Sequence, residues 1–373
     1  MASTPWRKRS SESTPGPRVA GVDPGTVSID VCVLDDGEVL LDQSFRSADL
    51  ALDPAPLVDA LAAHRPLDLV LGPAGYGLPL VPGERVGERE LALMLLVRSD
   101  QRGTRAGVGG MRALIRALIG AGLPLVFGPG AIHLPTISEH RKWNRIDLGT
   151  ADKVASAALC IADQAGRLGL AYEETSFIML ELGGAFTAAL AIDRGRIVDG
   201  VGGSCAPIGA RSCGALDAEV AYLLGPALSK ETVFSGGALG GLDLSTPGAL
   251  EAVRGDPSHR EEWQALEEGA VKAALALTVS VPAPREILVV GRLAGAPGLL
   301  EGLTERLAGV AAVRSADGLG TRAKTAAQGA ALLADGLAGG RYAPLVERLR
   351  VGEASGTVLD HLRMHGAESI HLA

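Results

Sequence analysis

Two short stretches of the sequence place an acid two residues before a glycine, each at the end of an apolar run. In GVDPGTVSID, Asp23 precedes Gly25, and in LELGGAFTA, Glu181 precedes Gly183. A glycine lets the backbone approach a ligand closely, and consecutive N–H groups at such a bend form a nest for anionic oxygens. An acid beside the bend can hold Mg²⁺ through water. We therefore expect both stretches to bind phosphate and magnesium.

The two stretches belong to a longer internal repeat. A shift of 158 positions lays residues 19–40 on residues 177–198, so that the two acids coincide and the turn glycine Gly37 meets Gly195. Each copy reads as an apolar strand, the acid-x-Gly corner, a second strand, a tight Asp-x-Gly turn and a third strand, and glycine accepts the positive φ of such turns. The repeat predicts an α/β fold with two similar halves, whose corners face a shared cleft.

Helices must bring further polar residues to this cleft. Residues 150–166 have apolar positions at helical spacing, with Thr150 at the N-cap position and Asp152 in the first turn, where negative charge is favourable. A buried strand near residue 288 turns at Gly291 into another helix. The glycine that ends this strand would let a base or ribose lie against the backbone.

An Ala-rich segment, residues 322–338, predicts a last helix with Gly329 at its middle. Glycine inside a helix costs about 1 kcal/mol relative to alanine. We therefore expect two backbones to cross closely at this glycine, as at a hinge between the two halves.

The composition excludes several classes of function. The formal net charge of −8 argues against a general nucleic-acid surface, and the four cysteines form no CxxC pair. No apolar run reaches the roughly 18 residues of a membrane span. Residues 1–16, basic and rich in Ser and Pro, predict a disordered tail and lack the apolar core of a signal peptide. We expect a cytoplasmic protein without nucleic-acid or membrane partners.

Two kinds of loop are candidates for holding an acceptor molecule. The loop GPAGYGLPL follows a buried strand and is a substrate wall or an ordinary tight connection. Charged loops before residue 150 and after residue 201 are an anion clamp or solvated turns. The residues concerned are Gly75 and Tyr76 in the first loop, and Arg141, Arg145, Asp147 and Arg211 in the charged loops.

In order, these motifs resemble the actin, sugar kinase and heat-shock ATPase superfamily. Its phosphate 1, connect 1, phosphate 2, adenosine and connect 2 elements correspond to GVDPGTVSID, GTADKVASAALCIA, LELGGAFTA, ILVVGRLAGAPG and AAQGAALLADG. Within this superfamily, GPAGYGLPL, IHLPTISEHRKWNRIDLGTADK and FSGGALG are similar to a prokaryotic family labelled as predicted butyrate kinases. The resemblance implies two RNase H-like domains, residues 17–165 and 166–373, around a central nucleotide cleft, with helix 322–338 at the hinge.

The resemblance also implies ATP and Mg²⁺ as cofactors and phosphorylation of a small acceptor. A carboxylate acceptor, giving an acyl phosphate, needs no general base because it is already ionised. A hydroxyl acceptor would need one, with Asp147 or Asp152 as candidates. A nucleotide-dependent switch is a third hypothesis, and the acceptor's identity and a homodimer are left open.

The expected roles follow the motifs. Two departures from the superfamily pattern concern phosphate 2, which has Glu181 for Asp and Ala185 for Thr, and a third is Arg292 in place of the second glycine of the adenosine motif. The catalytic and metal candidates are Asp23, Asp147, Asp152, Glu181, Arg141, Arg145 and Arg211, with Asp23 and Glu181 on the metal; the nucleotide candidates are Gly25, Thr26, Ser28, Gly183, Gly184, Gly291, Arg292 and Ala294; the substrate candidates are Gly75 and Tyr76.

Overall fold

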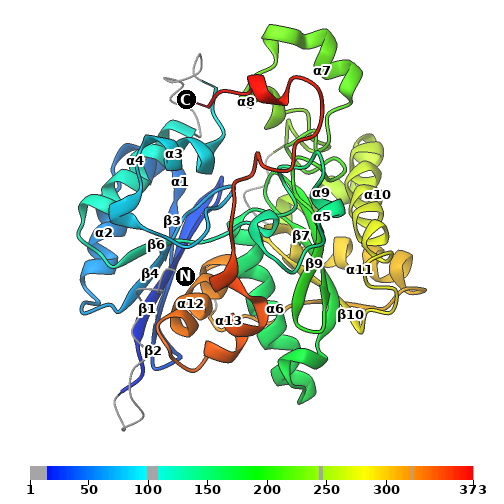
Figure 1. Ribbon diagram of the computed structural model, residues 1–373. Coiled ribbons are helices and arrows are strands. Elements are labelled where there is room, and N and C mark those ends of the chain that lie inside the picture. Colours follow the sequence, from blue (N-terminus) through cyan, green and yellow to red (C-terminus); the bar gives the residue numbers. More distant parts are fainter. Residues whose placement is uncertain (1–14, 99–107, 243–246, 321, 373) are drawn as a thin grey trace.

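A computed structural model describes residues 15–98, 108–242, 247–320 and 322–372, and two mixed β-sheets lie at its centre (Figure 1). The N-terminal sheet contains β1 (Arg18–Pro24), β2 (Ser28–Asp35), β3 (Glu38–Arg46), β4 (Leu69–Gly72), β5 (Val81–Pro82) and β6 (Leu125–Phe127). The C-terminal sheet contains β7 (Ser176–Leu182), β8 (Thr187–Asp193), β9 (Arg196–Val201), β10 (Glu286–Val290) and β11 (Ala312–Ser315).

The two sheets have the same strand order. The N-terminal sheet runs β3-β2-β1-β4-β6-β5 and the C-terminal sheet runs β9-β8-β7-β10-β11. In each, an antiparallel meander of three strands is extended by two parallel strands, and only the two-residue β5 has no counterpart. The mixed α/β fold with two similar halves that the repeat predicts is confirmed at this level.

The repeat extends to irregularities of the backbone. Each meander has one register shift, between Val33 and Leu34 in the first and between Ala191 and Ile192 in the second, again 158 positions apart. Each Asp-x-Gly turn has two successive residues at positive φ. Matching bulges and turns are difficult to explain as a chance likeness of two hairpins, since both fix the register of a strand pair.

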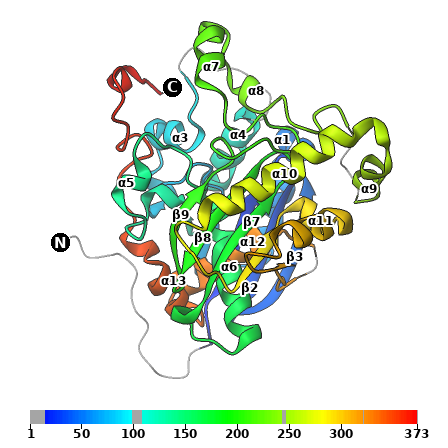
Figure 2. The same ribbon diagram turned by 90° about the vertical axis from the view of Figure 1, so that its right-hand side faces the viewer.

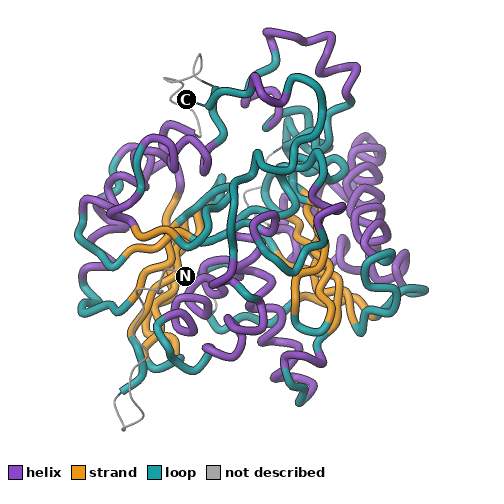
Figure 3. The backbone as a smooth tube through the Cα atoms, in the orientation of Figure 1, coloured by secondary structure: helices purple, strands orange, loops and turns teal. Residues whose placement is uncertain are grey.

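Two helices lie between the sheets, α6 (Ala151–Leu168) and α12 (Thr325–Leu337) (Figures 1 and 3). Helix α12 packs on β1, β2 and β4, whereas α6 contacts β7 and β8. A Cβ built on Gly329 would lie 1.8 Å from the Ala155 carbonyl oxygen, so the two backbones touch where the glycine is. The close crossing predicted at Gly329 is confirmed, although the helix begins at residue 325, not at 322.

Local sequence explains why α6 forms where it does. The apolar stripe predicted for this helix is buried, Asp152 lies in its first turn, and Gly169 ends it with a φ of 63°. The predicted domain boundary after residue 165 falls in the last turn of α6, and the division into two domains stays a prediction.

The remaining helices cover the outer faces of the sheets. In Figure 2, α10 crosses the outer face of the C-terminal sheet, in front of β7, β8 and β9. Beside the N-terminal sheet lie α1 (Ser47–Leu52), α2 (Ala55–Ala62), α3 (Glu88–Leu95) and α4 (Val108–Gly120); beside the C-terminal sheet lie α9 (Pro247–Gly255), α10 (Arg260–Leu277) and α11 (Pro297–Leu307); shorter helices are α5 (Glu139–Lys142), α7 (Ala218–Leu224), α8 (Lys230–Val233) and α13 (Ala343–Leu349).

No helix among the described residues is long and apolar enough to traverse a bilayer. The tail predicted for residues 1–16 falls, up to residue 14, outside the described part of the chain.

Candidate active site

The two acid-x-Gly corners face one another. A Cβ built on Gly184 of the second corner would lie 3.4 Å from Val27 Cγ2 and 3.8 Å from Thr26 Oγ1 of the first. The acids at the corners also interact electrostatically, because the charge of Asp23 contributes to raising the pKa of Glu181. The convergence that the repeat predicts is therefore present in the structure.

Four carboxylates and two lysines meet between the corners, and we call this group the acid centre. Lys324 Nζ lies 2.6 Å from Asp23 and 2.8 Å from Asp30, and Asp30 is fully buried. Lys153 pairs with the adjacent Asp152 and lies 2.7 Å from Glu181. The acid centre thus consists of two triads, each with one ammonium group between two carboxylates.

Burial and crowding shift the ionisation of these acids. Burial raises the pKa of Glu181 to about 7, because the opposing effect of Lys153 is smaller. Burial also raises the pKa of Asp23 against the effect of Lys324. For Asp152, burial disfavours the charge, but Lys153, Thr150 and Lys324 together outweigh it and lower the pKa. Perturbed carboxyl groups of this kind gather at functional sites.

Both lysines come from helix N-termini. Lys153 lies in the first turn of α6, and Lys324 is the N-cap residue of α12. The positive end of the helix dipole disfavours a cation there, so their position depends on the carboxylates of the corners. A Cβ on Gly25 would lie 2.3 Å from Lys324 Nζ, which shows that the glycine of the first corner makes room for this lysine.

The structure therefore adds Asp30, Lys153 and Lys324 to the residues predicted from the sequence. A signal for each exists: Asp30 interrupts an apolar strand, and both lysines stand where helix electrostatics disfavours them. The repeat does not reveal the lysines, because they are not 158 positions apart.

The predicted nucleotide residues lie around the second corner or within the first. A Cβ on Gly291, whose φ is 94°, would lie 2.6 Å from the Leu182 carbonyl oxygen, and Arg292 Cδ would lie 3.5 Å from a Cβ on Gly184. These contacts place the predicted adenosine motif beside phosphate 2. The other predicted members have partners in the protein: Ser28 Oγ donates to Asp30, Ala294 accepts from Ser315, and Gly183 donates to Phe186.

A second polar group, which we call the Tyr76 cluster, lies where the GPAGYGLPL loop meets the Gly-rich loop of the other half. Lys230 Nζ, from α8, donates to the Tyr76 hydroxyl over 3.2 Å and lies 4.7 Å from the centre of its ring. Burial raises the pKa of Tyr76, and the charges of Asp147 and Cys205 add to this. Gly75 anchors the loop to α6, because its carbonyl accepts from Ala151 N.

Asp147 has a different environment from the one predicted. Its carboxylate accepts hydrogen bonds from Gly149 N at 3.1 Å and from Ser204 N and Oγ, both at 3.0 Å. A Cβ on Gly202 would lie 1.7 Å from its Oδ1. Asp147 therefore fixes the Gly-rich loop against the segment before α6, and its oxygens are already engaged.

The predicted arginines have separate partners in the structure, and their role as an anion clamp stays a prediction. Arg141 donates to the Val198 carbonyl over 2.6 Å and lies 3.6 Å from Asp199, so it ties α5 to β9. Arg145 is exposed and lies beside Cys205, lowering the pKa of that thiol against the stronger effect of burial. Arg211 N donates to the Ala185 carbonyl, and its side chain has no carboxylate partner in the described part of the chain.

Magnesium fits the chemistry of the acid centre, although the described residues form no preformed set of direct metal ligands there. Across the residues that the structure describes, no three His, Cys, Asp or Glu side chains are arranged to hold a metal ion directly. Carboxylate oxygens are nevertheless the ligands that Mg²⁺ takes, usually while keeping several waters. One of them, Asp30 Oδ1, is buried without a hydrogen-bond partner. Asp23 and Glu181 are the candidates to hold hydrated Mg²⁺.

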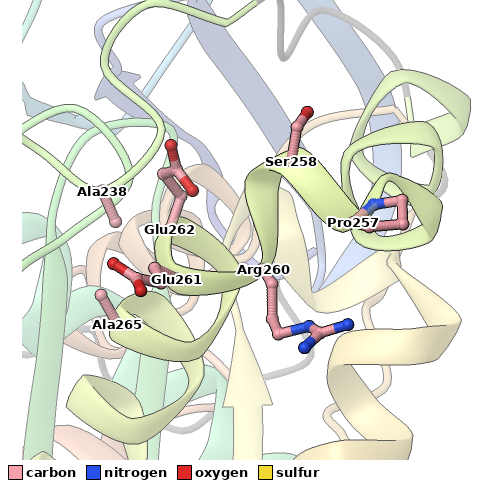
Figure 4. A pocket seen from close by; sticks show the side chains of 7 residues that line it. All are labelled: Ala238, Pro257, Ser258, Arg260, Glu261, Glu262 and Ala265. Atoms are coloured by element: carbon pink, nitrogen blue, oxygen red, sulfur yellow. The ribbon is translucent and has the colours of Figure 1, made fainter.

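A surface pocket near the N-terminus of α10 lies apart from these residues (Figure 4). Two acids, Glu261 and Glu262, would repel phosphate there, and the Arg260 side chain points away from them. Its lining is Ala238, Pro257, Ser258, Arg260, Glu261, Glu262 and Ala265. The pocket contains no predicted site residue, and we do not assign the chemistry to it.

Comparison with solved structures supports the predicted fold. The chain is similar to a propionate kinase from Francisella tularensis subsp. tularensis SCHU S4 (TM-score 0.57, 11% identity, 84% of this chain and 98% of that one). It is also similar to acetate kinases from Porphyromonas gingivalis (0.54, 16%, 79% and 88%) and Entamoeba histolytica (0.52, 12%, 78% and 86%). This likeness shows a shared fold, so the predicted mixed α/β kinase-type fold is confirmed, whereas membership of the superfamily and the narrower likeness to butyrate kinases stay predictions.

No curated protein matches the chain. A family model described as "Protein of unknown function (DUF1464)" matches residues 21–364, and the chain therefore belongs to this family.

Proposed function

We propose that the protein is an ATP-dependent phosphotransferase that phosphorylates a small carboxylate and forms an acyl phosphate. The observation that carries the proposal is the meeting of the two glycine corners over the acid centre, with Thr26 and Gly184 in close approach. Phosphoryl transfer needs positioning and charge compensation more than covalent chemistry from the protein. This arrangement supports both.

Each residue group has a separate task in the proposal. The corners, through Gly25, Thr26 and Gly184, bind the phosphates with backbone N–H groups, while Gly183, whose N–H donates to Phe186, shapes the second corner. Bound Mg²⁺ would compensate phosphate charge, held through water by Asp23 and Glu181. Lys153 and Lys324 hold the crowded carboxylates in place and offset part of their charge, and Arg211 supplies a further cation beside the second corner.

The state of the two candidate bases favours a carboxylate over a hydroxyl acceptor. Asp147 accepts three hydrogen bonds from the protein, and Asp152 is paired with Lys153, so neither offers a free oxygen for a substrate proton. A carboxylate nucleophile needs no base. The fold similarity to acetate and propionate kinases agrees with this choice.

The proposal is tested by incubating the full chain with ATP, Mg²⁺ and acetate, propionate or butyrate, in the presence of hydroxylamine. Formation of the acid's hydroxamate is expected. Phosphorylation of sugars or polyols without any hydroxamate would replace the proposal by a hydroxyl kinase. Slow ATP hydrolysis that no acceptor stimulates would instead support a nucleotide-dependent switch.

A further inference from the structure

Lys230 is a cation in a position where the two halves meet. Its ammonium donates to Tyr76, which lies 154 residues away in the chain, and lies 6.0 Å from the centre of the Phe234 ring. No carboxylate in the described part of the chain lies within ion-pair distance of it. Burial lowers the pKa of Lys230 to about 8, and the charge of Asp147 only partly opposes this.

An ammonium group in such surroundings costs free energy unless an anion joins it. The charge of Asp147 acts on it, but the oxygens of Asp147 are engaged with Gly149 and Ser204. The other titratable groups around the cluster are the Tyr76 hydroxyl, the Cys205 thiol and Arg145, none of which supplies a negative charge at neutral pH. Among the described residues, therefore, no group supplies the anion that would pair with Lys230.

Two contacts join the surroundings of the Tyr76 cluster to segments that carry the acid centre. The Tyr76 loop is bonded to the first residue of α6, because the Gly75 carbonyl accepts from Ala151 N over 3.0 Å. On the other side, the ring of Phe186, in the second corner, meets the ring of Phe234 edge-on at 5.0 Å. These contacts connect the surroundings of Lys230 with the first turn of α6 and with the second corner.

We propose that Lys230 binds the carboxylate of the acceptor, a short-chain aliphatic monocarboxylic acid whose hydrocarbon part lies against the rings of Tyr76, Phe186 and Phe234. This inference rests on the proposed phosphotransfer and names the acceptor class of the same site. A neutral sugar would give the ammonium no anion.

The reaction at this position balances without a proton transfer. An oxygen of the acceptor carboxylate forms a bond to the γ-phosphorus of ATP. The bond from that phosphorus to the bridging oxygen of the β-phosphate breaks, and ADP leaves with the electron pair. The ammonium of Lys230 offsets the repulsion between the entering carboxylate and the phosphate oxygens.

The test compares substitutions of Lys230 in the full chain. We expect Lys230→Met to raise the KM for propionate or butyrate about tenfold or more, because a charge-assisted contact is lost. The KM for ATP should change less than about twofold. Lys230→Arg should restore most of the affinity, and Lys272→Met, at an exposed lysine paired with Glu268 on α10, serves as a control that should behave as the wild type.

Saturation-transfer NMR with butyrate gives a second readout that does not depend on turnover. Its signal should fall in Lys230→Met and be retained in Lys272→Met, with thermal unfolding confirming that both variants fold. Should Lys230→Met prove unstable, Lys230→Gln replaces it in both measurements.

The outcomes separate this inference from the proposed function. A wild-type protein that forms hydroxamates, with an unchanged acid KM in Lys230→Met, would overturn the role of Lys230 alone. A lowered kcat with an unchanged acid KM would mean that Lys230 acts only in the transition state and does not bind the acceptor, which also overturns it. No hydroxamate from the wild type with any acid would remove the proposed function itself.

Discussion

The two corners of the acid centre are built from the same parts in different arrangements. In the first corner, both carboxylates, Asp23 and Asp30, come from one hairpin, and only Lys324 is supplied by a helix. In the second, Glu181 comes from the hairpin, whereas Lys153 and Asp152 are neighbours on α6. Position 188, which corresponds to Asp30 in the repeat, is an alanine.

Each corner also takes its lysine from a helix that follows the sheet of the other half. The lysine of the N-terminal corner comes from α12, near the C-terminal end of the chain, and the lysine of the C-terminal corner comes from α6, which follows the N-terminal sheet. The repeat thus accounts for the two β-meanders. The lysine that compensates the acids of each meander, in contrast, depends on the other half. The predictions below test how unequal the two corners are.

The largest effect is expected from removing the lysines. Lys324→Met leaves Asp30 fully buried without a counter-ion, and breaking such a pair costs about 3–5 kcal/mol. Lys153→Met should cost less than half of this, because the Glu181 side chain is 13% exposed and its pKa of about 7 lets it take up a proton. Urea unfolding of the ligand-free protein measures both losses.

A double substitution controls for the lost side-chain volume. Adding Asp30→Asn to Lys324→Met removes the orphaned charge and should recover part of the stability, whereas equal losses in the two single variants would contradict the inequality of the corners.

The helix crossing is expected to be the next most sensitive feature. In Gly329→Ala the new methyl group would meet the Ala155 carbonyl at 1.8 Å, and such overpacking costs about 1–3 kcal/mol or more. Gly166→Ala, in the other crossing helix, adds a methyl group with nothing within 4 Å and should stabilise by up to about 1 kcal/mol. Thermal unfolding of both variants measures the contrast, and a neutral Gly329→Ala would disprove the tight crossing.

Hydroxyl groups distinguish the corners on a smaller scale. The first corner has Thr26, whereas the second has Ala185 where the superfamily pattern has a hydroxyl. We expect Ala185→Ser to lower the KM for ATP about threefold and Thr26→Ala to raise it by a similar factor, in line with one hydrogen bond each. Steady-state kinetics at saturating acceptor give the values. If Thr26→Ala changes nothing, its hydroxyl does not contact the nucleotide.

The smallest effect is expected at the two hairpin turns, where Asp36 and Arg194 have φ values of 52° and 48°. Aspartate tolerates this left-handed region better than arginine does. Arg194→Gly should therefore stabilise by about 0.5–1 kcal/mol, whereas Asp36→Gly should be close to neutral. The midpoints of urea unfolding distinguish them, and the reverse order would show that the turns differ by more than their residues.

The sequence predicts the two β-meanders well, but it predicts poorly which groups compensate the charge of their acids. Corner and turn are local features repeated at a constant interval, so Asp23 and Glu181 could be predicted by comparing the chain with itself, and Gly329 could be predicted from its place inside an Ala-rich helix. Lys324 acts 301 positions away from Asp23, and Lys230 meets Tyr76 across the two halves, so only the packed fold brings them together. Asp147 and Arg141 were predicted at the site from charge alone, which does not reveal that backbone groups already engage them.

The place where α6 and α12 touch has a mechanical consequence. Ala155 and Gly329 are each the fifth residue of their helix, so the point of contact lies about one turn from both N-termini. If the two sheets rotate about this contact, the first turns of the helices, which carry the two lysines, move on lever arms of roughly 5 Å. The far ends of the helices move over much larger distances. Large movements of the outer parts of the two sheets would then leave the charged groups of the acid centre almost stationary.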